Sequence, residues 1–114
     1  KHTLIMIIDF NTMEVSVIPH FKGGEKEMSA QMFFDGSNRI LHGVLAPGAS
    51  IGEHKHETNS EILFVVKGCG TLHDDGVATA ITAGQCAYCP KGHSHMLVNT
   101  SDADLEFYAA VPEQ

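Results

Sequence analysis

The chain has 114 residues, 43% of them hydrophobic, which is enough for one domain with one core. Its formal net charge of -7 disfavours a general nucleic-acid binder, which would present a basic face. No apolar run approaches the length of a membrane span, and the most apolar N-terminal stretch, residues 4–8, is too short for the core of a secretory signal. We therefore expect a cytoplasmic protein without nucleic-acid or membrane partners.

Met6 would make a natural start for the chain. The five residues before it, 1–5, are interpreted as either native or left by a cloning vector. No function is assigned to them, including to His2. The domain is expected to comprise residues 6–114.

Short apolar or alternating runs, separated by turn signals every several residues, predict an all-β sandwich or barrel. The stretches 35–38 (DGSN) and 74–76 (DDG) predict hairpin turns, because Gly and Asn adopt positive φ at little cost. Residues 22–27 (KGGEKE) are expected to form a polar loop before the barrel proper. The predicted strands, in chain order, are 6–10, 14–18, 29–34, 39–45, 50–56, 61–67, 70–74, 77–81, 85–89, 95–99 and 105–111.

Four side chains in two separate stretches point to metal chemistry. His54 and His56 are followed five residues later by Glu61, and His95 comes shortly after a Pro-x-Gly turn. Residues two apart on a strand share a face, so His54 and His56 point the same way. Three imidazoles and one carboxylate on neighbouring strands suit a divalent first-row metal. The sequence therefore predicts one divalent transition metal ion inside a barrel, with Fe, Mn, Ni, Co, Cu and Zn all left open.

The two stretches resemble the two motifs of the cupin superfamily. Residues 48–68 follow the pattern G-x5-H-x-H-x4-E-x6-G, and residues 84–99 follow G-x5-P-x-G-x2-H-x3-N. The resemblance implies a double-stranded β-helix, which is a jelly-roll barrel with the metal near its open mouth, built as one small cupin type-2 domain of the bacterial kind. It also implies a homodimer that exchanges N-terminal strands, for which residues 6–18 are the candidate segment. The ten matched positions are Gly48, His54, His56, Glu61, Gly68, Gly84, Pro90, Gly92, His95 and Asn99.

Three further residues are candidates for acid–base catalysis. His42 lies on the strand before the first motif, where alternation allows it to face into the barrel or outward. His93 falls inside the turn before His95, which favours a position at the rim, and histidine titrates near neutral pH. Tyr88 and Cys89 are adjacent on a strand, so one of the two must face inward.

The rest of the pocket wall is expected to be apolar and short of charge. Leu63, Leu97 and Asn99 share strand faces with the predicted ligands, and together with Cys89 they are the pocket-lining candidates. Arg39 and the lysines lie outside the motif strands or point away from the ligands. A small neutral or mono-anionic molecule that chelates the metal through oxygen is therefore favoured.

The three cysteines do not predict a disulfide framework or a zinc site. Cys86 and Cys89 form a CxxC pair, but Cys69 stands alone and no second CxxC exists. A redox pair would normally open a helix, whereas these residues lie in a strand pattern. We interpret them as small strand residues.

The sequence is compatible with three functions. The first, which we favour, is a metal-dependent enzyme that acts on a small organic molecule by dioxygenase, isomerase or lyase chemistry; the fold does not choose among these. The second is a non-catalytic module that senses a metabolite or binds a metal. The third, a structural barrel with a vestigial site, is disfavoured because all four ligands are present.

Overall fold

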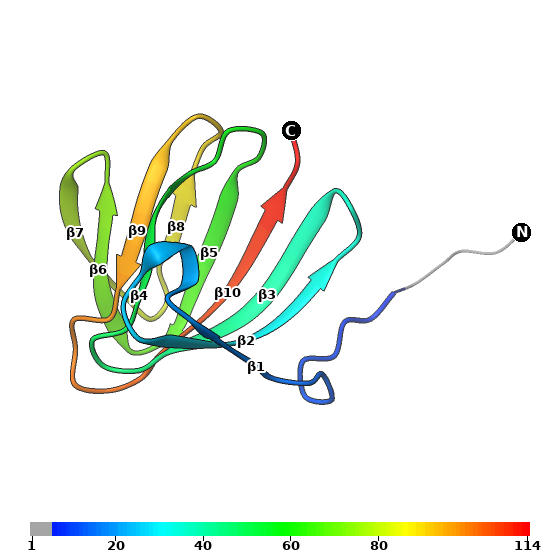
Figure 1. The fold of residues 1–114 in the computed structure, drawn as a ribbon, viewed down its shortest axis with the longest axis horizontal. Helices are drawn as coiled ribbons and strands as arrows, with labels where there is room; N and C mark the ends of the chain where they lie inside the picture. The colour runs from blue at the N-terminus through cyan, green and yellow to red at the C-terminus, as the bar shows by residue number, and fades with distance from the viewer. Residues whose placement is uncertain (1–5) are drawn as a thin grey trace, which may run out of the picture.

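The computed structural model describes residues 6–114, so the interpretation of residues 1–5 lies outside the described residues. Two antiparallel sheets pack face to face, with strand orders β1-β2-β3-β10-β5-β8 and β4-β9-β6-β7 (Figure 1). Between residues 6 and 114 no helix is long and apolar enough to cross a bilayer. The predicted all-β jelly roll is confirmed. Its elements are β1 (Ser16–Pro19), the 3-10 helix η1 (Phe21–Gly23), β2 (Glu27–Phe34), β3 (Asn38–Leu45), β4 (Ser50–Lys55), β5 (Glu61–Lys67), β6 (Cys69–Asp74), β7 (Val77–Thr82), β8 (Cys86–Cys89), β9 (Ser94–Val98) and β10 (Leu105–Pro112).

Strand alternation decides which side chains fill the barrel. On β10, Leu105, Phe107 and Ala109 are buried, whereas the residues between them face outward. On the neighbouring β5, Leu63 lies opposite Ala109 and Val65 lies opposite Phe107, so the two strands bury the same face. The side-chain period is two residues, so a slip of one residue would turn this apolar set to solvent. The hydrophobic pattern therefore specifies the register.

Both predicted hairpin turns are present. Asp75 and Gly76 connect β6 to β7 with φ values of 49° and 81°, which suits a tight turn between twisted strands. In the β2–β3 turn, the Oδ1 atom of Asp35 accepts the backbone N–H groups of Ser37 at 2.9 Å and Asn38 at 2.7 Å. These hydrogen bonds favour the charged carboxylate and lower the pKa of Asp35.

The two N-terminal strand predictions need correction. Residues 6–10 form no strand, and β1 begins only at Ser16, where the chain starts to pair with β2. The preceding segment is instead held by side chains: the Nε2 atom of Gln31 donates to the carbonyl oxygens of Phe10 at 2.5 Å and Met13 at 2.6 Å, and the Phe10 ring packs edge-on against Tyr108 at 5.5 Å. This segment therefore docks through side-chain contacts and not through strand pairing.

The expected polar loop at residues 22–27 also differs in detail. Its first residues belong to η1, and β2 already begins at Glu27. Three side-chain-bearing residues in this region, His20, Lys22 and Lys26, have left-handed backbone conformations, with φ values of 50°, 55° and 56°. Such conformations are uncommon without glycine and persist where surrounding contacts hold them.

We predict that Gln31→Ala releases the N-terminal segment from the sheet. The change removes the two hydrogen bonds to this segment and a third between the Oε1 atom of Gln31 and the Nδ1 atom of His42, each worth about 1 kcal/mol. Hydrogen exchange of the amides in residues 10–13 should accelerate, while exchange in β10 stays unchanged. Gln85→Ala is the matched control, because its side chain caps a turn in residues 82–85 instead. Unchanged exchange in the Gln31→Ala protein would contradict this assignment.

Candidate metal centre

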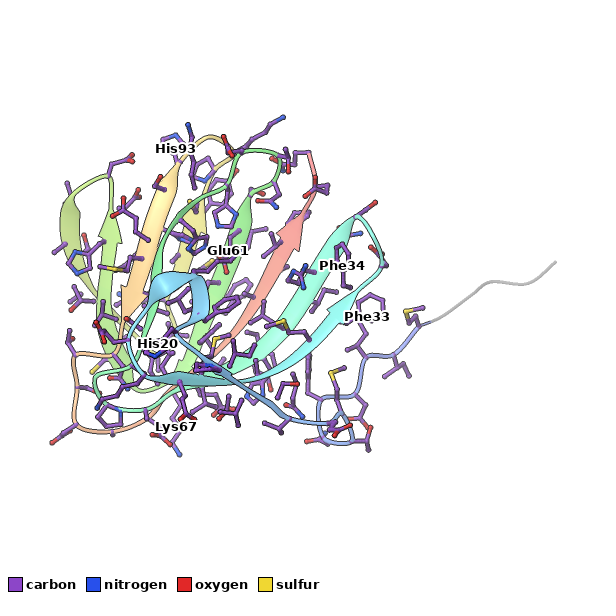
Figure 2. All side chains as sticks on the ribbon, in the orientation of Figure 1. His20, Phe33, Phe34, Glu61, Lys67 and His93 are labelled. Carbon is purple, nitrogen blue, oxygen red and sulfur yellow. The ribbon has the colours of Figure 1, made fainter. Side chains whose placement is uncertain are left out.

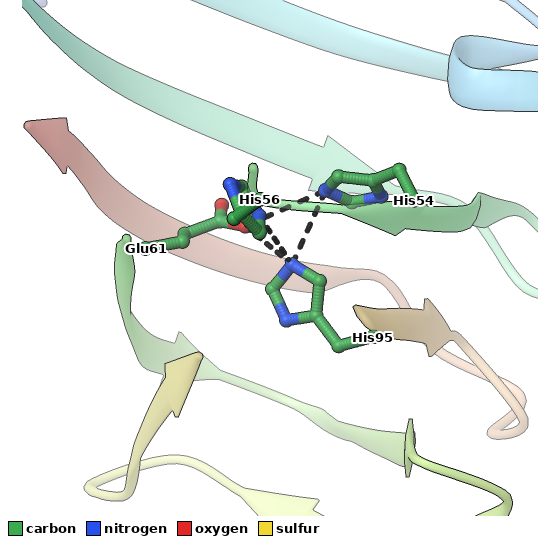
Figure 3. Close-up of side chains that lie close together, drawn as sticks. All are labelled: His54, His56, Glu61 and His95. Carbon is green, nitrogen blue, oxygen red and sulfur yellow. Dashed lines mark hydrogen bonds and ion pairs between the residues drawn. The ribbon is translucent and has the colours of Figure 1, made fainter. Parts of the chain in front are cut away.

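Strands from both sheets bring the four predicted ligands together. His54 lies on β4, His56 directly follows that strand, and His95 lies on β9, where it pairs with His54. Glu61 is the first residue of β5, which belongs to the facing sheet. The four side chains therefore meet between the two sheets (Figure 3).

The spacing of the donor atoms fits a single metal ion. One ligand atom from each of the four residues lies within 4.8 Å of all the others. The Nε2 atom of His95 is 2.6 Å from the Oε1 atom of Glu61, 3.0 Å from the Nε2 atom of His56 and 3.2 Å from that of His54. Metal–nitrogen bonds of about 2.1 Å place neighbouring octahedral ligands roughly 3.0 Å apart, so these separations match one coordination shell.

Burial and pairing set the charges of the cluster. His56, Glu61 and His95 are each 6% exposed, and His54 is partly buried. Burial alone would raise the pKa of Glu61, but hydrogen bonds from His54, His56 and His95 outweigh it and lower this pKa. The same contact with Glu61 raises the pKa of His56. Because a metal binds neutral imidazole, a bound ion would displace the protons that these pairs share.

Two neighbouring groups orient the histidines toward the centre. The Nδ1 atom of His54 lies 2.8 Å from the carbonyl oxygen of Gly52, and that of His56 lies 2.6 Å from the Oδ1 atom of Asn59. Asn59 in turn donates its Nδ2 hydrogen to Glu113 at 3.1 Å. With Nδ1–H donated outward, each Nε2 lone pair faces the site. The motif spacing missed both acceptors, one because it is a backbone carbonyl and the other because it lies in a loop.

A cavity of about 470 Å³ adjoins the ligands His54, His56 and Glu61. Its wall carries three cationic side chains, which come from η1, β3 and β4: Lys22, Arg39 and Lys55. The expectation of a wall short of charge is therefore wrong. Strand alternation predicts the face to which a strand residue points. It does not predict where a loop packs, or how far a long side chain at the end of a strand extends.

The four pocket-lining candidates lie in the barrel interior rather than in the wall of this cavity. Leu63, Cys89, Leu97 and Asn99 are each at most 3% exposed, and none of them borders the cavity. Asn99 donates its Nδ2 hydrogens to backbone carbonyls, including that of Leu45 at 2.7 Å. These residues share strand faces with the ligands, as predicted. They lie farther along the strands, however, where the barrel interior is filled by the core.

The three candidates for acid–base catalysis, His42, Tyr88 and His93, all lie outside the wall of the cavity. His42 lies on the outer face of β3, with its Nε2 atom 2.6 Å from the Oε2 atom of Glu106. Tyr88 is 58% exposed, so Cys89 is the inward member of that adjacent pair. His93 lies at the rim, as its turn predicted, and pairs with Asp75 at 3.2 Å (Figure 2). None of the three lines the cavity beside the ligands.

The cysteines are free thiols, as the sequence pattern indicates. Cys69 and Cys86 are exposed, whereas Cys89 is buried on the opposite face of β8 from Cys86. Burial, with further contributions from nearby carboxylates, raises the pKa of Cys89 to about 11. This thiol is therefore protonated near neutral pH and is a poor metal ligand or nucleophile.

The family model of the cupin domain matches residues 41–111, well over half of the chain. The chain belongs to the cupin family. The match begins within β3 and ends within β10, so it includes both motifs and every predicted ligand of this cupin.

Relatives of this cupin include proteins connected with oxalate. The chain is 31% identical over 112 residues to an oxalate-binding protein of Thermotoga maritima, covering 93% of each chain. A crystal structure of a predicted oxalate decarboxylase from Thermotoga maritima has a TM-score of 0.89 and 30% identity, and the match covers 96% of this chain and all of that one. A cupin 2 conserved barrel domain protein from Salinispora arenicola has a TM-score of 0.70 and 25% identity, and the match covers 99% of this chain and 91% of that one.

We predict that His56→Ala abolishes stable metal binding. The change removes one ligand and leaves Glu61 with fewer hydrogen-bond partners, so metal content after dialysis should fall well below one ion per chain. Inductively coupled plasma mass spectrometry provides the measurement. Cys89→Ala is the control and should keep the metal content of the unmodified protein. Full occupancy in the His56→Ala protein would refute the ligand assignment.

Proposed function

We propose that this cupin binds one divalent transition metal through His54, His56, Glu61 and His95, and with it a small carboxylate such as oxalate. One observation carries the proposal: four convergent ligand atoms lie beside a cavity whose wall holds three cationic side chains. A bound divalent ion supplies positive charge and open coordination positions for oxygen ligands. The cavity falls within the size range of small-molecule sites.

The charges of the cavity favour an anion. Among residues 6–114, every ion pair is formed by a histidine with a carboxylate, so Lys22, Arg39 and Lys55 have no carboxylate partner. Apart from the ligand Glu61, one carboxylate, that of Glu57, lines the cavity. A cleft with an excess of one charge sign concentrates ligands of the opposite sign. This supports a small anion despite the negative net charge of the whole chain.

The relatives supply the candidate anion. The Thermotoga maritima protein that matches nearly the whole chain is an oxalate-binding protein. Oxalate chelates a metal through two oxygens and leaves two oxygens facing away from it. The cationic wall provides donors for such oxygens.

The proposal predicts that oxalate binding depends on the metal. Isothermal titration calorimetry of the metal-loaded protein should show saturable oxalate binding, and acetate should bind roughly tenfold or more weakly, because it offers fewer oxygens. The protein stripped with a chelator, and the His56→Ala variant, should bind neither. Oxalate binding of equal strength with and without metal would overturn the proposal.

Catalytic conversion of the bound carboxylate is the second candidate function. Glu57 favours it, because this exposed carboxylate lines the cavity without belonging to the ligand set and is placed to exchange protons. Incubation of the metal-loaded protein with oxalate under air, followed by assays for carbon dioxide and formate, tests this candidate. Binding without either product would assign the protein to the non-catalytic binding modules.

We also propose that the protein forms a homodimer through the outer face of the six-stranded sheet. This face exposes large apolar side chains on adjacent strands β10, β5 and β8: Tyr108, Phe64, Val66 and Tyr88. A contiguous apolar patch of this kind is typical of an interaction surface. In the structure, β1 pairs with β2 of its own chain. If residues 6–18 were exchanged in the dimer, β1 of each chain would make the same pairing with β2 of the other.

Light scattering coupled to size-exclusion chromatography should therefore report a dimer for the unmodified chain. Phe64→Glu places a charge in the patch and should give a monomer. Val77→Glu changes an apolar residue on the other sheet that is at least as exposed, and this variant should remain dimeric. A monomeric unmodified chain would contradict this assignment.

A further inference from the structure

A short segment between β1 and β2 crosses the edge of β4 beside the metal centre. Residues 20–26, here called the strap, include η1, and Figure 2 labels His20 at one end. The strap closes on itself, because the backbone N–H of His20 donates to the carbonyl oxygen of Lys26 at 2.8 Å. It is tied to β4 by Ser50, whose N–H donates to the Glu25 carbonyl at 3.0 Å and whose Oγ accepts the Glu25 N–H at 2.8 Å.

Two glycines let the strap approach β4 closely. A Cβ atom on Gly52 would lie 2.0 Å from the carbonyl oxygen of Lys22, and one on Gly24 would lie 2.0 Å from that of Ser50. Any side chain at either position would therefore displace the strap. Gly52 is also the residue whose carbonyl orients His54. The position of Lys22 is thus linked, through one strand residue, to a predicted metal ligand.

The side chain of Lys22 lines the same cavity as His54 and His56. Its Nζ atom lies 5.6 Å from the centroid of the Phe21 ring, and no carboxylate among residues 6–114 pairs with it.

The other two cations of the cavity are placed differently. The guanidinium of Arg39 stacks on the Phe34 ring at 4.5 Å, and its nitrogen contacts the sulfur of Met32 at 3.9 Å. Lys55 also lines the cavity, but it lies between His54 and His56 at the end of β4, so its side chain leaves the strand on the side opposite to their rings. Lys22 is therefore the cation best placed to contact a ligand bound at the metal centre.

We infer that Lys22 determines ligand specificity by donating a charge-assisted hydrogen bond to a carboxylate oxygen that faces away from the metal centre. This inference rests on the proposed function. Oxalate keeps two such oxygens when it chelates a metal, whereas a chelating monocarboxylate keeps none. Lys22 therefore favours small dicarboxylates over monocarboxylates of similar size.

Lys22→Met tests the inference, because it keeps the length of the side chain and removes the charge. Calorimetry on metal-loaded protein should show oxalate affinity reduced by about tenfold to a hundredfold, as expected for the loss of one charge-assisted hydrogen bond. Acetate affinity and metal content should stay within about twofold, because neither depends on this contact. Lys22→Arg should restore most of the oxalate affinity.

Lys26→Met is the matched control. It lies on the same strap with a similar backbone conformation, but its Nζ atom donates to the carbonyl oxygen of Pro47 and it does not line the cavity. It should bind oxalate like the unmodified protein. Gly24→Ala supplies an independent test of position: Gly24 has a φ of -74°, which alanine adopts freely, so the change acts through the clash of its Cβ atom with the β4 backbone at Ser50 and Gly52. It should lower oxalate affinity, because it displaces the strap that carries Lys22.

The outcomes separate this inference from the function on which it rests. If the unmodified, metal-loaded protein binds no oxalate, the proposed function fails, and the inference fails with it. If that protein binds oxalate and Lys22→Met binds it equally well, the inference alone is overturned. Equal losses of oxalate and acetate affinity in Lys22→Met would also overturn it, since they would indicate a general effect of charge.

Discussion

A buried carboxylate facing three imidazole nitrogens is the interaction on which the rest of this structure depends. Glu61 is almost fully enclosed, and an isolated charge in such a place would be costly. Contacts with His54, His56 and His95 keep it ionised and hold the four donor atoms together. Because Glu61 comes from one sheet and His54 and His95 come from the other, the same cluster also connects the two halves of the barrel.

Irregular backbone beside the ligands completes their geometry. β4 departs from regular pairing with β9 between Ile51 and His54, and Gly52 lies within this departure. Irregularities of this type are common next to functional sites, where they redirect side chains. Gly52 has two effects here. Its carbonyl orients His54, and its lack of a side chain allows the strap to pack closely against β4. Local distortion of a strand therefore couples the metal centre to the wall of the cavity.

The distribution of charge distinguishes the cavity from the rest of the molecule. The chain has only seven lysines and arginines against fourteen acidic residues, yet three of those seven line this cavity. The net negative charge of the whole chain repels an anion, whereas the local excess of cations attracts one to the cavity. The ligand set and the cationic wall are thus complementary parts of one site, and they come from different segments of the chain.

Alternating runs, turn residues and the spacing of the histidines were sufficient to predict the all-β fold, the turns at Asp35 and Asp75, and the four residues that converge. These features depend on strand alternation and turn chemistry, which are local properties of the chain. The same rules failed for residues 6–10, whose apolar run has the pattern of a strand but pairs with no strand of either sheet. They also left open the direction of His42, because alternation fixes which residues share a face and not which face meets the other sheet.

The sequence by itself determined the all-β architecture and which side chains are offered to a metal, since periodicity and turn residues act over a few positions. Only the tertiary structure decided that Lys22, Arg39 and Lys55 surround the cavity and that Tyr88 is turned to solvent. The physical reason is that the wall of a cavity is assembled from segments far apart in the chain. Its charge therefore depends on where the strap packs, which no local pattern encodes.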